Sequence, residues 1–302
     1  MRASPPAYLP IVVLLTGSVL WGLTWLPLKW LNGLGFEGVA VTTIAFGTAG
    51  LVLLPVLYRQ RAQWLDRRTP LLLVALIGGY ANLAFAMAMI YGEVVRVMVL
   101  FYLLPAWGVL GGRIFLGERI DLARWLAVAL ALTGAFFVLG GMEALRGAIS
   151  WIDVMALTAG MGLAGNNLVF RADQHVPVPS KLTAMMLGGF GMGALLLAAG
   201  VQPDTVLFVP DALWIAAYGG IWLMAATAAT QWGVTHMEAG RASILIVMEL
   251  VTAVGSAMLI AGERLEPMEW LGAALILTAT LIEALRTARP EESTPDESLF
   301  PP

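Results

Sequence analysis

The sequence has no cysteine, and its only histidines are His175 and His236 among 302 residues. Without cysteine, neither a disulfide framework nor a thiolate metal site can form. Both histidines fall near the ends of apolar stretches and have no companion at metal-ligand spacing. We therefore expect no metal and no cofactor.

Charge is also scarce: 12% of the residues are charged, whereas 59% are hydrophobic. A chain of this size cannot cover a soluble globule with so little polar surface. Uncharged runs at 38–58, 70–92, 182–203 and 212–237 each exceed the roughly 20 residues that a membrane-spanning helix needs. Alternation with a period of two residues, typical of membrane barrels, is absent. The net charge of −3 is small, and the chain has no basic stripe, so we expect no nucleic-acid partner.

These runs predict an all-α membrane protein with ten transmembrane helices, embedded in the lipid bilayer. The predicted spans are 8–31, 36–58, 70–91, 94–114, 121–140, 152–172, 179–200, 210–235, 239–261 and 267–286.

One stretch of the chain occurs twice. Arg96, Gly117-Glu118-Arg119 and Trp125 reappear 145 residues later as Arg241, Gly262-Glu263-Arg264 and Trp270. Ten spans give five to each copy, and an odd number of spans places the second copy upside down relative to the first. Inverted repeats of this kind are typical of transporters.

The repeats define the predicted organisation: 1–140 holds the first five helices, and 151–286 holds the second five. Glycines and charges between them interrupt the apolar pattern. The segment 287–302 is rich in Pro, Glu and Ser, and we expect a flexible tail. With the N-terminus inside, all but four of the 17 Lys and Arg residues fall in cytoplasmic loops, so both termini are predicted to be cytoplasmic.

Several short motifs indicate a known family. They are Trp21-Gly22, Leu104-Pro105, the two Gly-Glu-Arg copies, and Met248-Glu249-Leu250, which resembles a Leu-Glu-Pro motif with Leu250 in place of the proline. Together with the duplication, they resemble the EamA family of the drug/metabolite transporter superfamily, and within it the aromatic amino acid exporters of the YddG type. The resemblance implies an exporter of the inner (plasma) membrane that works by alternating access through a central cavity.

Polar and aromatic side chains inside the spans are the candidates for the substrate site, because they are costly in lipid unless paired or facing water. The candidates are Trp21, Trp25, Tyr80, Asn82, Tyr102, Asn166, Asn167 and Gln231. Uncharged amides can bind both the carboxylate and the ammonium of an amino acid. The alternative role for each amide is a hydrogen bond between helices.

Trp21 and Trp25 lie one helical turn apart, well inside the first span, where they can stack on a flat substrate or pack between helices. Glu249 is the one acidic residue near the centre of a predicted span. It is a possible proton carrier, a partner for a substrate amine, or a structural acceptor of hydrogen bonds.

Arg96 opens the fourth span and opposes the helix dipole, so we expect a carboxylate partner, with Glu93 as the candidate. A gate or helix-end clamp is one interpretation, and snorkelling to the interface is the other.

Lys and Arg are absent from the middle of the spans, which argues against phosphorylated substrates. We therefore expect a small neutral or zwitterionic substrate, with aromatic and other hydrophobic amino acids first. Nucleobases, drugs or another metabolite are the alternatives. An intramembrane enzyme is disfavoured because no nucleophile and base, metal cluster or carboxylate pair is evident. The oligomeric state stays open, and a monomer suffices.

Overall fold

The computed structural model describes residues 8–117, 120–139, 141, 149–201, 209–237, 242 and 245–287. In these ranges every regular element is a helix, and no strand occurs. The predicted tail after residue 287 lies outside them, as do Glu118, Arg119 and Arg241 of the repeated motifs.

The first half of the chain forms a succession of helices. They are α1 (Leu9–Gly22), α2 (Trp25–Gly33), α3 (Gly38–Arg59), α4 (Arg61–Trp64), α5 (Arg68–Leu73), the π-helix η1 (Val74–Gly78), α6 (Gly79–Tyr91), α7 (Val94–Phe101), α8 (Leu104–Phe115) and α9 (Leu122–Val138).

The second half continues in the same way. Its helices are α10 (Trp151–Ala172), α11 (Val178–Ala198), α12 (Val209–Ala217), the π-helix η3 (Tyr218–Leu223), α13 (Met224–Thr235), α15 (Met248–Ser256), the π-helix η4 (Ala257–Ala261) and α16 (Pro267–Thr287).

Six helical stretches of the described chain are long and apolar enough to cross a membrane. They are Leu9–Gly33, Gly38–Arg59, Arg68–Tyr91, Val94–Phe115, Val178–Ala198 and Ala212–Thr235. Three further helices are also apolar but shorter: Leu122–Val138, Met248–Ala261 and Pro267–Ile282. The count of ten spans and the inverted repeats remain predictions.

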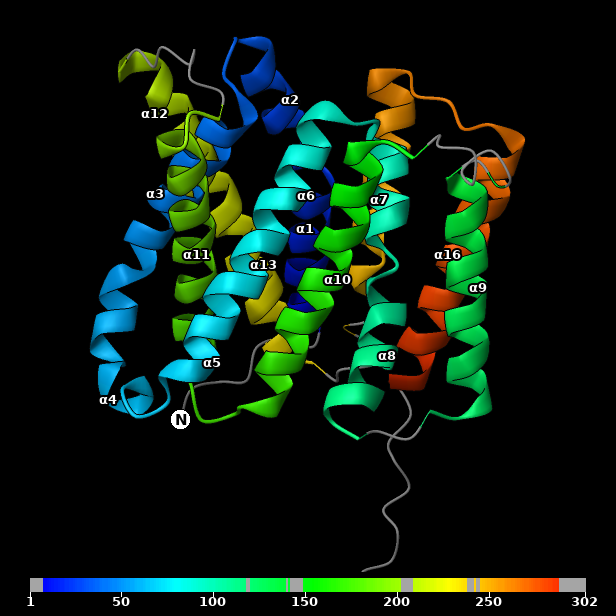
Figure 1. The fold of residues 1–302 in the computed structure, drawn as a ribbon, viewed down its shortest axis with the longest axis horizontal. Coiled ribbons are helices and arrows are strands. Elements are labelled where there is room, and N and C mark those ends of the chain that lie inside the picture. Colours follow the sequence, from blue (N-terminus) through cyan, green and yellow to red (C-terminus); the bar gives the residue numbers. More distant parts are fainter. Residues whose placement is uncertain are drawn as a thin grey trace, which may run out of the picture.

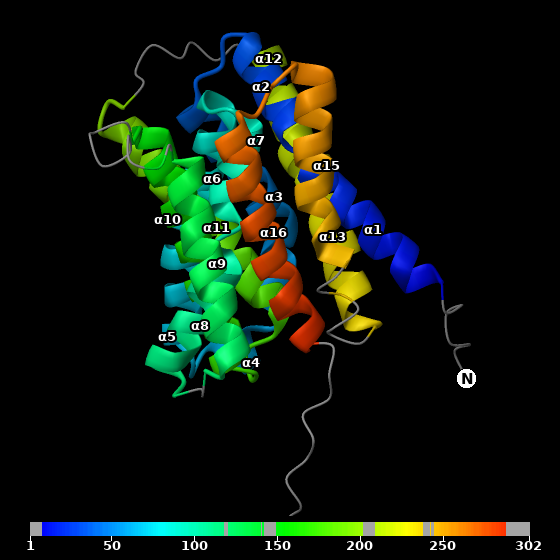
Figure 2. The ribbon, with the colours of Figure 1, turned by 90° about the vertical axis from the view of Figure 1, so that its right-hand side faces the viewer.

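The bundle has two ends, which we name by the helices that start or stop there. At the terminal end, α1 begins and α13 and α16 end; at the α7 end, α7, α10 and α16 begin (Figure 1). The pair α7–α8 and the pair α15–η4 contain the two copies of the sequence repeat. They run in opposite directions between these ends (Figure 2).

The first glycine of each Gly-Glu-Arg copy stops a helix. Gly117 and Gly262 both have φ of 69°, in the left-handed region that favours glycine. Gly117 follows α8 and Gly262 follows η4. A left-handed glycine after the last turn is a common helix stop, so the repeated motif ends the helix in the same way in both copies.

Two close helix crossings hold the bundle together. A side chain at Gly188 of α11 would collide with the Ala75 carbonyl in η1, and one at Gly219 of η3 would collide with the Ala45 carbonyl in α3. Small residues at such crossings let helices approach closely in a membrane, where packing drives association. Each crossing joins a π-helix of one half to a helix of the other.

Candidate functional site

A cavity of about 520 Å³ lies in the middle of the bundle, within the range of small-molecule sites. It is lined by Trp21, Ala81, Asn82, Phe85, Phe101, Tyr102, Leu104, Pro105, Leu163, Asn167, Met185, Thr230, Gln231, Val234, Ile246, Val247, Glu249 and Thr280. Both halves of the chain contribute. A binding site between structural repeats is the arrangement expected for secondary transporters.

The cavity extends from the middle of the bundle toward the terminal end. Leu163 and Asn167 belong to the second half of α10, and Gln231 and Val234 to the last turns of α13. In Figure 2, α1 slants away from α16 as it approaches this end. The charged residues at the α7 end do not line the cavity.

Aromatic rings form one side of the cavity. Phe85 and Phe101 lie with ring centroids 4.5 Å apart, and Phe101 contacts Tyr102 at 6.1 Å between centroids. Trp21, near the end of α1, is half-buried and lines the same space. Rings in this arrangement offer flat faces on which a flat solute can stack.

Polar groups line the rest of the cavity. The amide of Asn82 donates to the Gly78 carbonyl at 2.8 Å, and the Tyr102 hydroxyl donates to the Ile246 carbonyl at 3.3 Å. Asn167 is exposed to the space, and Gln231 and Thr230 lie on the same helix. These groups supply both donors and acceptors without charge.

Glu249 is the single ionisable carboxyl among the lining residues, which include no Lys, Arg or His. It lies in the first turn of α15, with Ile246 and Val247 beside it. The described residues contain no group of His, Cys, Asp or Glu that could hold a metal ion. The electrostatics of the cavity therefore favour solutes that are neutral, zwitterionic or positively charged over anions.

The helices that reach the cavity are interrupted beside it. α7 ends at Phe101 and α8 begins at Leu104, so the turn at Tyr102 lies within one predicted span. The turn at Val247 before α15 lies 145 residues later, at the equivalent position of the other repeat. Both interruptions place backbone and side-chain polar groups next to the cavity, where non-helical backbone at membrane depth is tolerated.

Six of the nine residues predicted from sequence line this cavity: Trp21, Asn82, Tyr102, Asn167, Gln231 and Glu249. Their binding roles stay predictions.

Trp25, Tyr80 and Asn166 lie elsewhere. The indole of Trp25 is 3% exposed and donates to Ser256 Oγ at 3.0 Å. α1 ends at Gly22 and α2 starts at Trp25, so a spacing of four residues does not put both tryptophans on one face.

Tyr80 and Asn166 point away from the cavity, because neighbouring positions on a helix face different directions. Tyr80 is 41% exposed, and its hydroxyl is 2.8 Å from Thr158 Oγ1 on the outside of the bundle. Asn166 is buried against Gly78. We leave these residues out of the proposed site.

Sequence reasoning missed the apolar and hydroxyl lining, notably Phe85, Phe101, Thr230 and Thr280. Phe85 follows Asn82 by three residues, which places both on one helix face, so the pattern contained this signal. Thr280 had no such signal, because the residues next to it in the chain, Ala279 and Leu281, are apolar.

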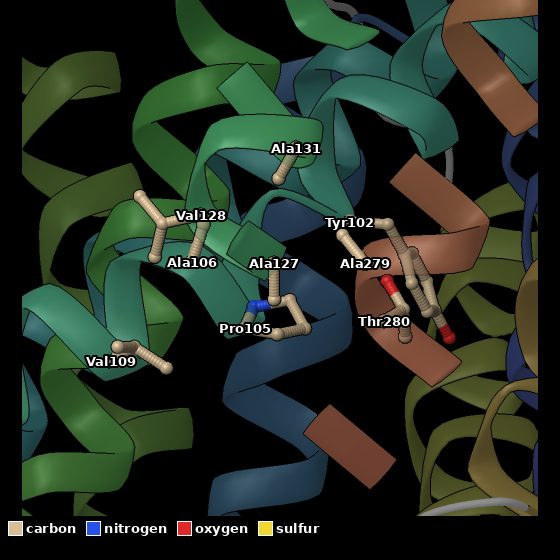
Figure 3. Close-up of a pocket in the computed structure, with 9 residues that line it drawn as sticks. All are labelled: Tyr102, Pro105, Ala106, Val109, Ala127, Val128, Ala131, Ala279 and Thr280. Carbon is tan, nitrogen blue, oxygen red and sulfur yellow. The ribbon is translucent and has the colours of Figure 1, made fainter. Parts of the chain in front are cut away.

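A small void adjoins the cavity between α8, α9 and α16 (Figure 3). Tyr102, Pro105 and Thr280 line both spaces. Its volume of about 10 Å³ is close to the minimum for one water, and its other lining residues are alanine and valine. The void is therefore a packing gap rather than a second site.

Arg96 has different partners from the predicted Glu93. Its Nε donates to Asp153 Oδ1 at 2.7 Å and its Nη2 to Asp153 Oδ2 at 3.1 Å, while Nη1 donates to Glu269 Oε1 at 3.4 Å. The prediction of Glu93 was wrong. The helices α10 and α16, which carry Asp153 and Glu269, begin at the same end of the bundle as α7, and this brings their carboxylates to Arg96. These contacts are long-range and carry no sequence signal.

Glu263 of the second Gly-Glu-Arg copy also contacts the start of α7. Glu263 Oε1 accepts from the backbone N of Val94, and Oε2 accepts from the backbone N of Val95, both at 2.9 Å. These N–H groups start α7 and have no partner within the helix. We call Arg96, Asp153, Glu263 and Glu269 the α7 cluster.

The terminal end also has an ion pair, which is more exposed than that of Arg96 and Asp153. Arg67 Nη1 lies 3.6 Å from Asp173 Oδ2, and the Arg67 side chain is 49% exposed. Asp173 also accepts from the backbone N–H groups of His175 and Val176. Burial raises the pKa of Asp173, but these hydrogen bonds and the charges of Lys181 and Arg67 together hold it below its ordinary value.

The model of the EamA-like transporter family matches residues 9–140 and 150–284. The chain is 28% identical over 269 residues to a protein of Rhizobium johnstonii named riboflavin transporter, covering 85% of this chain and 83% of that protein. It is 26% identical over 220 residues to an uncharacterized transporter of Pseudomonas aeruginosa, covering 70% and 71% of the two chains.

One solved crystal structure also superposes on the fold, with a TM-score of 0.60 over 93% of this chain and 98% of the other. The two sequences are 16% identical, so this likeness concerns the fold alone.

Proposed function

Because the chain belongs to the EamA-like transporter family, we propose that this membrane transporter moves flat, neutral or zwitterionic solutes by alternating access through the central cavity. Aromatic and other hydrophobic amino acids are the first candidates, and export from the cell is the proposed direction.

The composition of the cavity carries this proposal. Phe85, Phe101 and Trp21 offer ring faces, and the amides of Asn82, Asn167 and Gln231 offer uncharged donors and acceptors. An aromatic amino acid needs both kinds of contact, one for its ring and one for its zwitterionic end. In this arrangement, Glu249 is placed to accept from the substrate ammonium.

Anions fit this cavity poorly. Phosphate recognition in a dry site normally uses Arg or Lys, and no lining residue is basic. A phosphorylated solute therefore finds no partner for its charge.

A riboflavin-like heterocycle is the second candidate, because one relative that aligns over most of the chain is named riboflavin transporter. Riboflavin is flat, uncharged and rich in hydrogen-bonding groups, so it fits the same aromatic and amide lining. The two candidates differ at Glu249, since riboflavin has no ammonium group.

Counterflow into proteoliposomes tests the proposal. The panel contains tryptophan, leucine, adenine, riboflavin and riboflavin 5′-phosphate, which shares the riboflavin ring but adds a charged phosphate. We expect flux of tryptophan or riboflavin well above that of empty liposomes, and none of the phosphate ester. Preferred transport of the phosphate ester would contradict the proposed substrate class.

We also propose ten spans in two inverted five-helix repeats, at 1–140 and 151–286, with both termini cytoplasmic in the inner membrane. The opposite directions of α7–α8 and α15–η4 and the matching φ of Gly117 and Gly262 support this topology. A reporter that is active only in the cytoplasm should be active when fused to the C-terminus. Activity of a periplasmic reporter at that position would contradict the topology.

A further inference from the structure

We propose that the α7 cluster is the gate that closes the cavity at the α7 end, and that it must break before a solute can leave there. This inference rests on alternating access in the proposed function, but it assigns residues that do not touch the solute. The cluster comprises Arg96, Asp153, Glu263 and Glu269.

Arg96 ties α7 to two helices of the other half. Both of its bonds to Asp153 are short, 2.7 and 3.1 Å, and form a bidentate pair with α10. Its third bond, at 3.4 Å, goes to Glu269 in the first turn of α16. Bidentate arginine–carboxylate pairs have a fixed geometry, so the starts of these three helices are held in register.

Glu263 adds a second connection between the halves. Its two carboxylate oxygens cap Val94 and Val95 from the loop between η4 and α16. A carboxylate at a helix N-terminus also interacts favourably with the helix dipole. The cap therefore fixes the start of α7 to the second half of the chain.

Burial makes these contacts strong. The Asp153 side chain is 3% exposed, that of Glu269 17% and that of Arg96 24%. Charges shielded from water interact more strongly than surface pairs and are screened less by salt. Asp153 is further fixed because it accepts from the Ser150 backbone N at 2.9 Å.

The position of the cluster explains why it acts as a gate. The cavity lies between the two halves and extends toward the terminal end, whereas the cluster joins those halves at the α7 end. Opening the α7 end requires α7 to separate from the starts of α10 and α16. In the described conformation every bond of the cluster opposes that separation.

Cysteine accessibility tests the gate without requiring a known substrate. The chain has no cysteine, so Leu163→Cys gives a single thiol in the cavity. A membrane-impermeant maleimide is applied to vesicles of known orientation, from either side. With the cluster intact, we expect labelling from the side of the terminal end and little from the side of the α7 end.

Three changes should raise the ratio of labelling from the α7 side to labelling from the terminal side. They are Glu269→Gln, Glu263→Gln, and the double change Arg96→Gln with Asp153→Asn. We expect labelling from the α7 side to rise about tenfold in the double variant, because the minor open state gains population. Smaller rises should follow from the single variants. Exchanging the charges, Arg96→Asp with Asp153→Arg, should restore much of the original ratio.

Arg67→Gln is the matched control, since it breaks an ion pair at the terminal end. It should not raise labelling from the α7 side. Glu269→Gln removes the negative charge from only one of the three bonds of Arg96, so it remains a usable test if the double variant fails to fold.

Unchanged labelling in the folded variants, or an equal rise from both sides, would overturn the gate. A gate that behaves as expected in a chain that transports no tested solute would instead point to a wrong substrate class. The two proposals therefore fail separately.

Discussion

The two ends of the helix bundle are built differently. At the α7 end, four charged side chains from both halves form a shielded network, with Asp153 only 3% exposed. At the terminal end, Arg67 and Asp173 form an ion pair in which the Arg67 side chain is 49% exposed. The cavity extends toward the end with the more exposed pair.

The difference shows how a chain with few charges uses them. Only 12% of its residues are charged, and burying a charge in a membrane protein is costly unless it is paired. The buried network is therefore located where the halves must be held together. The cavity itself contains one carboxyl, which leaves the binding surface to rings and amides.

The largest expected effect comes from removing Arg96. Arg96→Ala leaves the buried Asp153 carboxylate without its ion partner, and breaking a buried pair from one side costs about 3 kcal/mol. Arg67→Ala, at the exposed pair, should cost about 0–1 kcal/mol. Unfolding midpoints in detergent compare the two. An equal drop in the unfolding midpoint of both variants would mean that the ion pairs at the two ends stabilise the protein equally.

The second-largest expected effect concerns Glu249, the single carboxyl among the residues that line the cavity. Glu249→Gln should reduce counterflow of tryptophan, because a hydrogen bond to a charged group is worth about 1.5–3 kcal/mol, and should leave riboflavin flux nearly unchanged. We expect wild-type flux to ignore an imposed pH gradient, since the lining offers Glu249 no second carboxyl as a relay. A gradient response lost in Glu249→Gln would instead make this residue a proton carrier.

The cap on α7 predicts a smaller effect. Glu263→Ala removes both acceptors of Val94 and Val95 and should lower the free energy of unfolding by about 0.5–2 kcal/mol. Asp121→Ala removes the acceptor of the Arg124 backbone N at the start of α9 and serves as the control. Both should destabilise to a similar extent in detergent, but only Glu263→Ala should expose a cavity thiol to the α7 side.

The smallest effect concerns Trp21, which lines the cavity. Trp21→Ala should weaken transport of tryptophan relative to leucine by about 0.5–1.5 kcal/mol, the worth of aromatic stacking. Trp25→Ala should lower stability without changing that ratio, since Trp25 is bonded to Ser256 away from the cavity. Equal losses for both solutes in Trp21→Ala would favour a packing role.

Much of the fold was predictable because apolar runs translate directly into helices. The predicted span 36–58 corresponds to α3 at Gly38–Arg59, and 152–172 to α10 at Trp151–Ala172. The interruptions were not predictable from hydropathy. The turns at Leu23–Thr24 and at Tyr102–Leu103 occur within continuous apolar stretches, and each precedes a proline, Pro27 or Pro105, that has no N–H to continue the helix.

The candidate site was predictable only in part, for the same reason. Asn82, Asn167 and Gln231 stood out as polar groups in apolar runs, and the structure places them on the cavity. Polarity does not reveal direction, so Asn166 and Tyr80 were equally good candidates. The role of Glu263 as a cap was hidden because its partners lie 168 and 169 residues away.

The most direct test of the central claim is substrate protection of a thiol in the cavity. In Leu163→Cys, saturating tryptophan or riboflavin should slow maleimide labelling from the side of the terminal end, whereas riboflavin 5′-phosphate should not. Protection by the neutral or zwitterionic ring compounds alone is the result that the cavity predicts. Labelling that no compound slows, or that the phosphate ester slows best, would contradict the assignment of this cavity as the transport site.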